Sequence, residues 1–86
     1  MGSVVRSVAG RDRKRVFLVV GTDGEGSGAR LLTVDGNLRR VNSPKRKNPG
    51  HVRVIGQLSE DETVRIGELD DEAVRLLIER FDDGRC

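Results

Sequence analysis

Aromatic residues are scarce in this sequence, which has no Trp, no Tyr and only two Phe, Phe17 and Phe81. Proteins that hold single-stranded nucleic acid commonly stack bases on aromatic side chains, and grooves that hold Pro-rich peptides are lined by them. Phe17 lies in the most apolar run of the chain and Phe81 ends an apolar helical stripe, so we expect both in the core. Base stacking and an aromatic peptide groove are therefore both disfavoured.

Cysteine and histidine are equally scarce, with Cys86 and His51 as the only examples. One thiol cannot form an intrachain disulfide, and one His with one Cys does not supply the ligands of a metal site. No Ser/His/Asp set is credible around His51, and Asp70-Asp71 is better explained by helix capping than by acid–base catalysis. We expect a protein that is not an enzyme, with no metal, no cofactor and no small-molecule substrate.

Long apolar runs are also missing, since the longest covers residues 16–20. Five residues are far too few to span a bilayer. The beginning of the sequence shows no apolar segment of a secretory signal. We expect a cytoplasmic protein with no membrane partner.

Acidic residues are few in the first part of the chain, so the charge is divided unevenly. Residues 1–53 hold twelve Lys and Arg against four Asp and Glu, a net charge of +8, while residues 54–86 hold four against ten, a net charge of −6. Such segregation usually presents the basic part to a polyanion, here nucleic acid. Any one basic residue could be an ordinary solvated charge, but as a cluster we interpret them as the contact residues: Arg11, Arg13, Lys14, Arg15, Arg39, Arg40, Lys45, Arg46, Lys47 and Arg53.

Short apolar segments separated by turns predict a small antiparallel barrel of about five strands. Asp35-Gly36 is a strong hairpin signal because its turn needs positive φ. The expected strands cover residues 2–9, 15–22, 29–34, 38–41 and 51–57, with Lys45, Arg46 and Lys47 in a connecting loop. His51 could donate to a phosphate or a base, or could simply pack at a strand edge.

The last third of the chain predicts a helix over about residues 70–81. Asp70 is a suitable N-cap, and apolar residues then recur at i, i+3, i+4 and i+7 as Val74, Leu77, Ile78 and Phe81. This apolar face could dock on the barrel, which we favour, or bind a protein partner. Residues 58–69 fit either a short strand or a loose turn. We therefore divide the chain into a barrel over residues 1–57 and an acidic extension over residues 58–86.

Two segments resemble a known family. Residues 4–12 (VVRSVAGRD), followed by the strand at 16–21, resemble the KOW motif, in which two strands flank a glycine-containing loop of an SH3-like barrel. The stretch Asp35-Gly36-Asn37-Leu38-Arg39-Arg40-Val41, followed by Pro44-Lys45-Arg46-Lys47 and His51, is similar to the small bacterial KOW-domain RNA-binding proteins. These are relatives of a large-subunit ribosomal protein of archaea and eukaryotes.

This resemblance covers about residues 2–53 and implies an SH3-like barrel that binds ribosomal or other structured RNA. By position, the resemblance implies that Gly10, Arg11 and Asp12 provide loop geometry and contact. The second cluster that it implies is Arg39, Arg40, Lys45, Arg46, Lys47 and His51. The family usually has a glycine soon after that Asp, where this chain has Arg13-Lys14-Arg15. Residues 21–28 and the tail after Val52 also differ from the family.

Together these observations predict a non-catalytic RNA-binding protein of the translation machinery, which could also contact ribosomal proteins. The alternative is a protein-interaction adaptor of the ribosome or the transcription machinery, because SH3-like barrels serve several functions.

Overall fold

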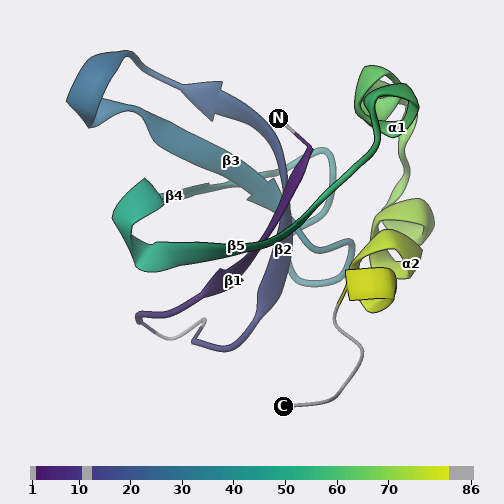
Figure 1. Ribbon diagram of the computed structural model, residues 1–86, viewed down its shortest axis with the longest axis horizontal. Coiled ribbons are helices and arrows are strands. Elements are labelled where there is room, and N and C mark those ends of the chain that lie inside the picture. The colour runs from purple at the N-terminus through teal and green to yellow at the C-terminus, as the bar shows by residue number, and fades with distance from the viewer. Residues whose placement is uncertain (1, 11–12, 82–86) are drawn as a thin grey trace.

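One curved antiparallel sheet and a helical layer make up the computed structural model, which describes residues 2–10 and 13–81. Within these residues the sheet has five strands in the order β4-β3-β2-β1-β5 (Figure 1). The strands are β1 (Ser3–Ser7), β2 (Val16–Asp23), β3 (Arg30–Val34), β4 (Lys45–Lys47) and β5 (Val52–Gln57). Short 3₁₀ turns precede β3 (η1, Gly26–Gly28) and β5 (η2, Pro49–His51). A mainly β protein with an antiparallel sheet is thus confirmed.

The sheet bends along β2 but does not close on itself. The first half of β2 pairs with β1, from Val16 to Leu18, and its register with β3 shifts between Val19 and Gly21. A second register shift separates Val4 from Val5 where β1 meets β5. Such bulges add local twist and bend a strand. The two edge strands, β4 and β5, are joined by the single turn of η2, so their adjoining ends remain close.

The prediction of a strand over residues 38–41 is wrong, and so is the loop predicted for Lys45–Lys47, because that segment forms β4. Gly36 does take positive φ, at 77°, as Asp-Gly suggests. However, the Asp35 carboxylate accepts hydrogen bonds from the backbone N–H groups of Asn37 (2.9 Å) and Arg39 (2.8 Å). These bonds satisfy the backbone within a compact loop, so the chain returns to the sheet only at β4.

Helix α2 (Asp71–Phe81) confirms the predicted helix and its N-cap, since Asp70 Oδ1 accepts from the backbone N–H of Ala73 at 2.8 Å. It lies against one face of the sheet (Figure 1). Val74 is fully buried, and Leu77, Ile78 and Phe81 pack against the same core. Phe81 lies so close over Gly56 that a Cβ there would clash with the ring. Docking of this apolar face on the sheet is therefore confirmed.

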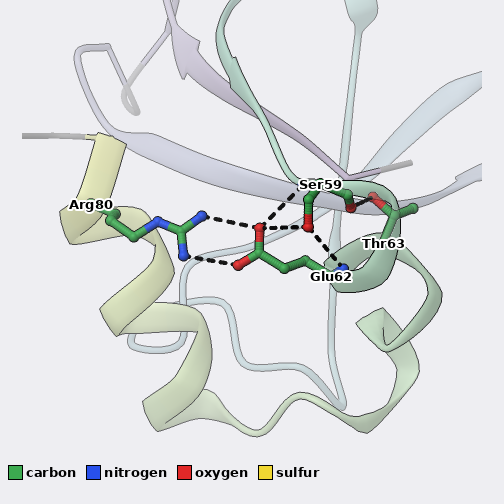
Figure 2. A network of polar contacts seen from close by, with 4 residues as sticks. All are labelled: Ser59, Glu62, Thr63 and Arg80. Carbon is green, nitrogen blue, oxygen red and sulfur yellow. Dashed lines mark hydrogen bonds and ion pairs between the residues drawn. The ribbon is translucent and has the colours of Figure 1, made fainter.

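Helix α1 (Glu60–Val64) and the 3₁₀ turn η3 (Ile66–Glu68) occupy the segment for which the sequence left a strand or a loose turn open. Ser59 Oγ accepts from the backbone N–H of Glu62, and Glu62 Oε1 accepts from the backbone N–H of Ser59 (Figure 2). This reciprocal capping box explains why the helix begins at Glu60. The Ser-x-x-Glu spacing was visible in the sequence and would have identified it.

The centre of the sheet, at β1 and β2, is buried on both faces. The helix-side core, between the sheet and the helical layer, contains Val4, Val16, Leu18, Val34, Leu58 and Val74. The sheet-side core, on the opposite face, contains Val5, Phe17 and Val19, with Leu31 and Val52 packed against them. In the described part of the chain, no helix is both long and apolar enough to cross a membrane.

The α1 and α2 helices are joined by an ion pair. Arg80 donates from Nη1 to Glu62 Oε2 at 2.8 Å and from Nη2 to Glu62 Oε1 at 3.1 Å (Figure 2). The Arg80 guanidinium and the Ser59 N–H lower the pKa of Glu62 from 4.5 to about 2. Two parallel hydrogen bonds fix the orientation of both side chains, so the pair also sets how α1 sits against α2.

We expect this ion pair to make stability depend on pH. Since folding lowers the pKa of Glu62, the contribution of its carboxylate is present above pH 4.5 and is lost as the pH falls to about 2. At pH 7, Glu62→Gln should have a lower melting temperature than the unmodified protein. Near pH 2, the melting temperatures of the two proteins should be close. Thermal unfolding monitored by circular dichroism at pH 7, 4 and 2 measures this. An unchanged gap between the two proteins at all three pH values would contradict it.

Burial of Val74 should contribute much more to stability than exposed residues of the same helix. Val74→Ala removes two methyl groups from a fully buried site and should lower the free energy of unfolding by about 2 kcal/mol. Leu76→Ala, at a leucine that is 61% exposed, should change it by less than about 0.5 kcal/mol. Urea denaturation of both variants measures the difference. Similar losses in the two variants would mean that α2 is not anchored through Val74.

Candidate nucleic-acid interface

Two of the predicted basic segments meet around the side chain of Asp35. Arg15, which precedes β2, and Arg39, from the loop after β3, line the same cavity of about 300 Å³ together with Asp35. Arg15 Nη1 lies 3.9 Å from Asp35 Oδ2, and the Asp35 side chain is only 11% exposed. The hydrogen bonds of Asp35 with its own loop therefore hold Arg39 beside the β1–β2 hairpin.

A neighbouring cavity of about 400 Å³ adds a basic residue from the acidic half of the chain. Its cationic lining residues are Lys14, Arg15 and Arg75, and its acidic ones are Asp35 and Glu79. Arg75, on α2, donates a hydrogen bond to the backbone carbonyl of Gly36. The docking of α2 thus adds a third cation beside the hairpin.

Arg6 and Arg53 extend this cluster across the sheet. They are direct partners in the β1–β5 register, and Arg6 Nη1 donates to the backbone carbonyl of Lys14 at 3.0 Å. Opposed like charges on neighbouring strands destabilise a sheet. This pairing places two further cations beside Lys14.

These contacts define one continuous region, which we call the basic surface. It takes residues from β1, the β1–β2 hairpin, the loop after β3, β5 and α2: Arg6, Lys14, Arg15, Arg39, Arg53 and Arg75. Arg13 is exposed in the same turn as Lys14. Among the residues that the structure describes, Asp35 and Glu79 are the acidic ones that line the cavities of this region, against the six cations.

The predicted cluster at Lys45–Lys47 is not presented as a loop. Lys47 is 8% exposed, and its Nζ donates to Ser7 Oγ at 3.1 Å and lies 5.6 Å from the centre of the Phe17 ring. Its ammonium therefore contacts residues of and beside the sheet-side core, and it is shielded from a ligand. Arg46 is exposed but pairs with Asp23 at 2.7 Å, and Lys45 is half-buried on β4.

The other predicted site residues lie as follows. Arg40 is exposed next to Arg39, and His51 is exposed at the end of η2, where its carbonyl accepts from the N–H of Val8 at 2.9 Å. Gly10 has φ of 75°, which suits the loop-geometry role expected of it. Arg11 and Asp12 lie outside the described residues.

Lys14 has a strained backbone. Its φ is 73°, and it is the only non-glycine residue with positive φ in the described part of the chain. Glycine adopts this left-handed conformation freely, whereas a long side chain there costs on the order of 1 kcal/mol or more. Lys14 lies within Arg13-Lys14-Arg15, the segment in which the resembled family usually has a glycine. A need for the Lys14 charge in ligand binding would explain why a strained Lys is kept at this position.

Sequence reasoning missed Arg6 and Arg75. Arg6 alternates with Val4 and Val8 as part of a strand, and only the strand register shows that it faces Arg53. Arg75 belongs to the acidic segment and lies 39 residues from Gly36, with which it bonds. No local pattern in the sequence signals either contact, because both depend on pairing between distant segments.

Comparison with known proteins finds neither a family model nor a curated protein that matches this chain. Among residues 2–10 and 13–81, no group of three or more His, Cys, Asp and Glu is placed to hold a metal ion.

Lys14→Gly should separate stability from ligand binding. Glycine relieves the positive-φ strain, so the free energy of unfolding should stay the same or rise by up to about 1 kcal/mol. If Lys14 contacts a phosphate, losing one released counterion weakens RNA affinity on the order of tenfold at 0.1 M salt. Urea denaturation and fluorescence anisotropy with a labelled RNA hairpin measure the two effects. If Lys14→Gly binds the RNA with unchanged affinity, Lys14 is not part of the interface.

Proposed function

We propose that this protein binds structured RNA through the basic surface and catalyses no reaction. The observation that carries the proposal is the convergence of six cations from five separate parts of the fold, including the opposed pair Arg6 and Arg53 and the strained Lys14. Lys and Arg arranged in this way match the phosphates of a nucleic-acid backbone.

The kind of nucleic acid follows from what surrounds these cations. Phe17 is buried and Phe81 packs over Gly56, which leaves neither available to stack on an unpaired base. Helix α2 lies in an acidic segment and packs its apolar face on the sheet, which does not suit insertion into a DNA major groove. Recognition of phosphates, sugars and the shape of a folded RNA fits these features best.

An SH3-like barrel of the KOW kind is our proposal for the fold. The supporting features are the bent β2 shared by two parts of the sheet, the short η2 between the edge strands, and the β1–β2 hairpin that carries Gly10. The resemblance of residues 2–53 to KOW-domain proteins leads us to propose ribosomal RNA as the ligand and the cytoplasm as the location. A nuclease-treated pull-down tests the adaptor alternative, which is favoured if partners remain bound after RNA digestion.

Arg53→Gln should weaken RNA binding, and Arg46→Gln should not. Arg53 belongs to the basic surface, so its loss should lower affinity for an RNA hairpin and reduce the slope of log affinity against log salt by roughly one unit. Arg46 already pairs with Asp23 outside this surface, which makes it a matched control. Anisotropy titrations between 50 and 300 mM KCl, values chosen so that counterion release is measurable, give both quantities.

Two outcomes would contradict the proposal. Equal effects of the two substitutions would show that binding is not localised on the basic surface. A single-stranded RNA of the same length that binds as tightly as the hairpin would show that RNA structure is not recognised.

A further inference from the structure

The cavity of about 400 Å³ beside the β1–β2 hairpin, which we call the hairpin cavity, is lined by more than cations. Val16 and Ile78 give it an apolar part, and Glu79 adds a carboxylate. Its volume lies in the range of pockets that hold small molecules, about 300–1,000 Å³. A backbone phosphate needs only the cations, so the apolar surface and the carboxylate favour a ligand that carries a further chemical group.

The two acidic residues of the hairpin cavity differ in what they can offer a ligand. Asp35 is committed to its own loop, since its Oδ1 accepts from two backbone N–H groups and its Oδ2 lies 3.9 Å from Arg15 Nη1. Glu79 is exposed and forms no ion pair with another described residue. Its carboxylate is therefore the acceptor that a ligand can reach.

A carboxylate in this place limits which part of an RNA can enter. It repels phosphates, and it loses hydrogen bonds with water when a ligand covers it. Both costs are offset if the ligand donates hydrogen bonds to the two carboxylate oxygens. Guanine is the base that presents two neighbouring donors, N1–H and N2–H, on its Watson–Crick edge. Adenine, cytosine and uracil each present one donor group there, beside acceptors that a carboxylate would repel.

Helix α2 supplies a surface for the plane of the base. Ile78 and Glu79 lie at i+3 and i+4 from Arg75, so the three share one side of the helix. Arg75 Nη1 donates to the carbonyl of Gly36, which restricts the guanidinium before a ligand binds. Unpaired RNA bases stack on Arg guanidinium planes as well as on aromatic rings. The scarcity of aromatic residues therefore does not prevent this cavity from holding a base.

We propose that the hairpin cavity binds one unpaired guanosine that projects from the folded RNA as a bulge. Glu79 accepts hydrogen bonds from N1–H and N2–H, Arg75 and Ile78 contact the plane of the base, and Lys14 and Arg15 contact the flanking phosphates. The guanosine must be unpaired because pairing would occupy the edge that Glu79 recognises. This inference rests on the proposed RNA binding and names the nucleotide that the basic surface selects.

The experiment is a set of anisotropy titrations with labelled RNA hairpins that differ at one bulged nucleotide. The hairpin with a bulged guanosine should bind roughly tenfold more tightly than those with a bulged adenosine, cytidine or uridine. A bulged inosine keeps N1–H but lacks the N2 amino group, so its affinity should fall between. The same hairpin without a bulge measures binding through the stem alone.

Glu79→Gln tests the carboxylate, and Glu72→Gln is its matched control. The amide of Gln has one acceptor and places a donor against the second guanine N–H, so Glu79→Gln should reduce the preference for guanosine to less than about threefold. It should also bind the hairpin without a bulge more tightly, because a negative charge is lost. Glu72 is exposed on the same helix and is not among the residues that line the hairpin cavity, so Glu72→Gln should keep the full preference.

Three outcomes would overturn the inference. Equal affinity for all bulged hairpins would do so and would leave the proposed RNA binding intact. A preference for guanosine that Glu79→Gln keeps, or that Glu72→Gln loses equally, would show that Glu79 does not recognise the base. Absence of binding to every hairpin would contradict the proposed function, and this inference with it.

Discussion

Burial of β2 on both faces is the constraint on which the rest of the structure depends. Val16 and Leu18 point into the helix-side core, while Phe17 and Val19 point into the sheet-side core. A strand that is apolar on both faces needs two covers. One is provided by α2 through Val74, and the other by the curvature of the sheet itself, which brings Leu31 and Val52 over Phe17.

This arrangement also decides where charge can gather. Docking α2 beside the β1–β2 hairpin adds Arg75 to Lys14 and Arg15, and the β1–β5 register adds Arg6 and Arg53. The same helix keeps Glu72 and Glu79 exposed, and Glu79 lines the cavity that also holds Lys14, Arg15 and Arg75. One helix therefore closes the core and contributes a cation to the basic surface. The fold therefore does not keep the two charge segments of the sequence apart, since α2 brings Arg75 and Glu79 to Lys14 and Arg15.

Much of the fold was predictable because its elements have clear local signals. Alternation and β-branched residues identified β1, β2, β3 and β5, and the apolar period with the Asp70 cap identified α2. The fourth strand was misplaced because the hairpin rule for Asp35-Gly36 takes no account of a side chain that captures two backbone amides. Helix α1 was missed although Ser59 and Glu62 form a recognisable capping pair. At Asp35 the local rule failed because a hairpin turn and a side-chain-capped loop compete for the same residues.

By itself the sequence determined the secondary-structure periods, the scarcity of aromatic, cysteine and histidine side chains, and the division of charge between the two parts of the chain. Only the tertiary structure decided which charges meet. Lys47 turns inward to Ser7 and Phe17, while Arg6 and Arg75, which no motif marks, join Lys14 and Arg15. The physical reason is that these contacts depend on strand register and helix docking. Both are set by packing between residues far apart in the chain, which no local pattern encodes.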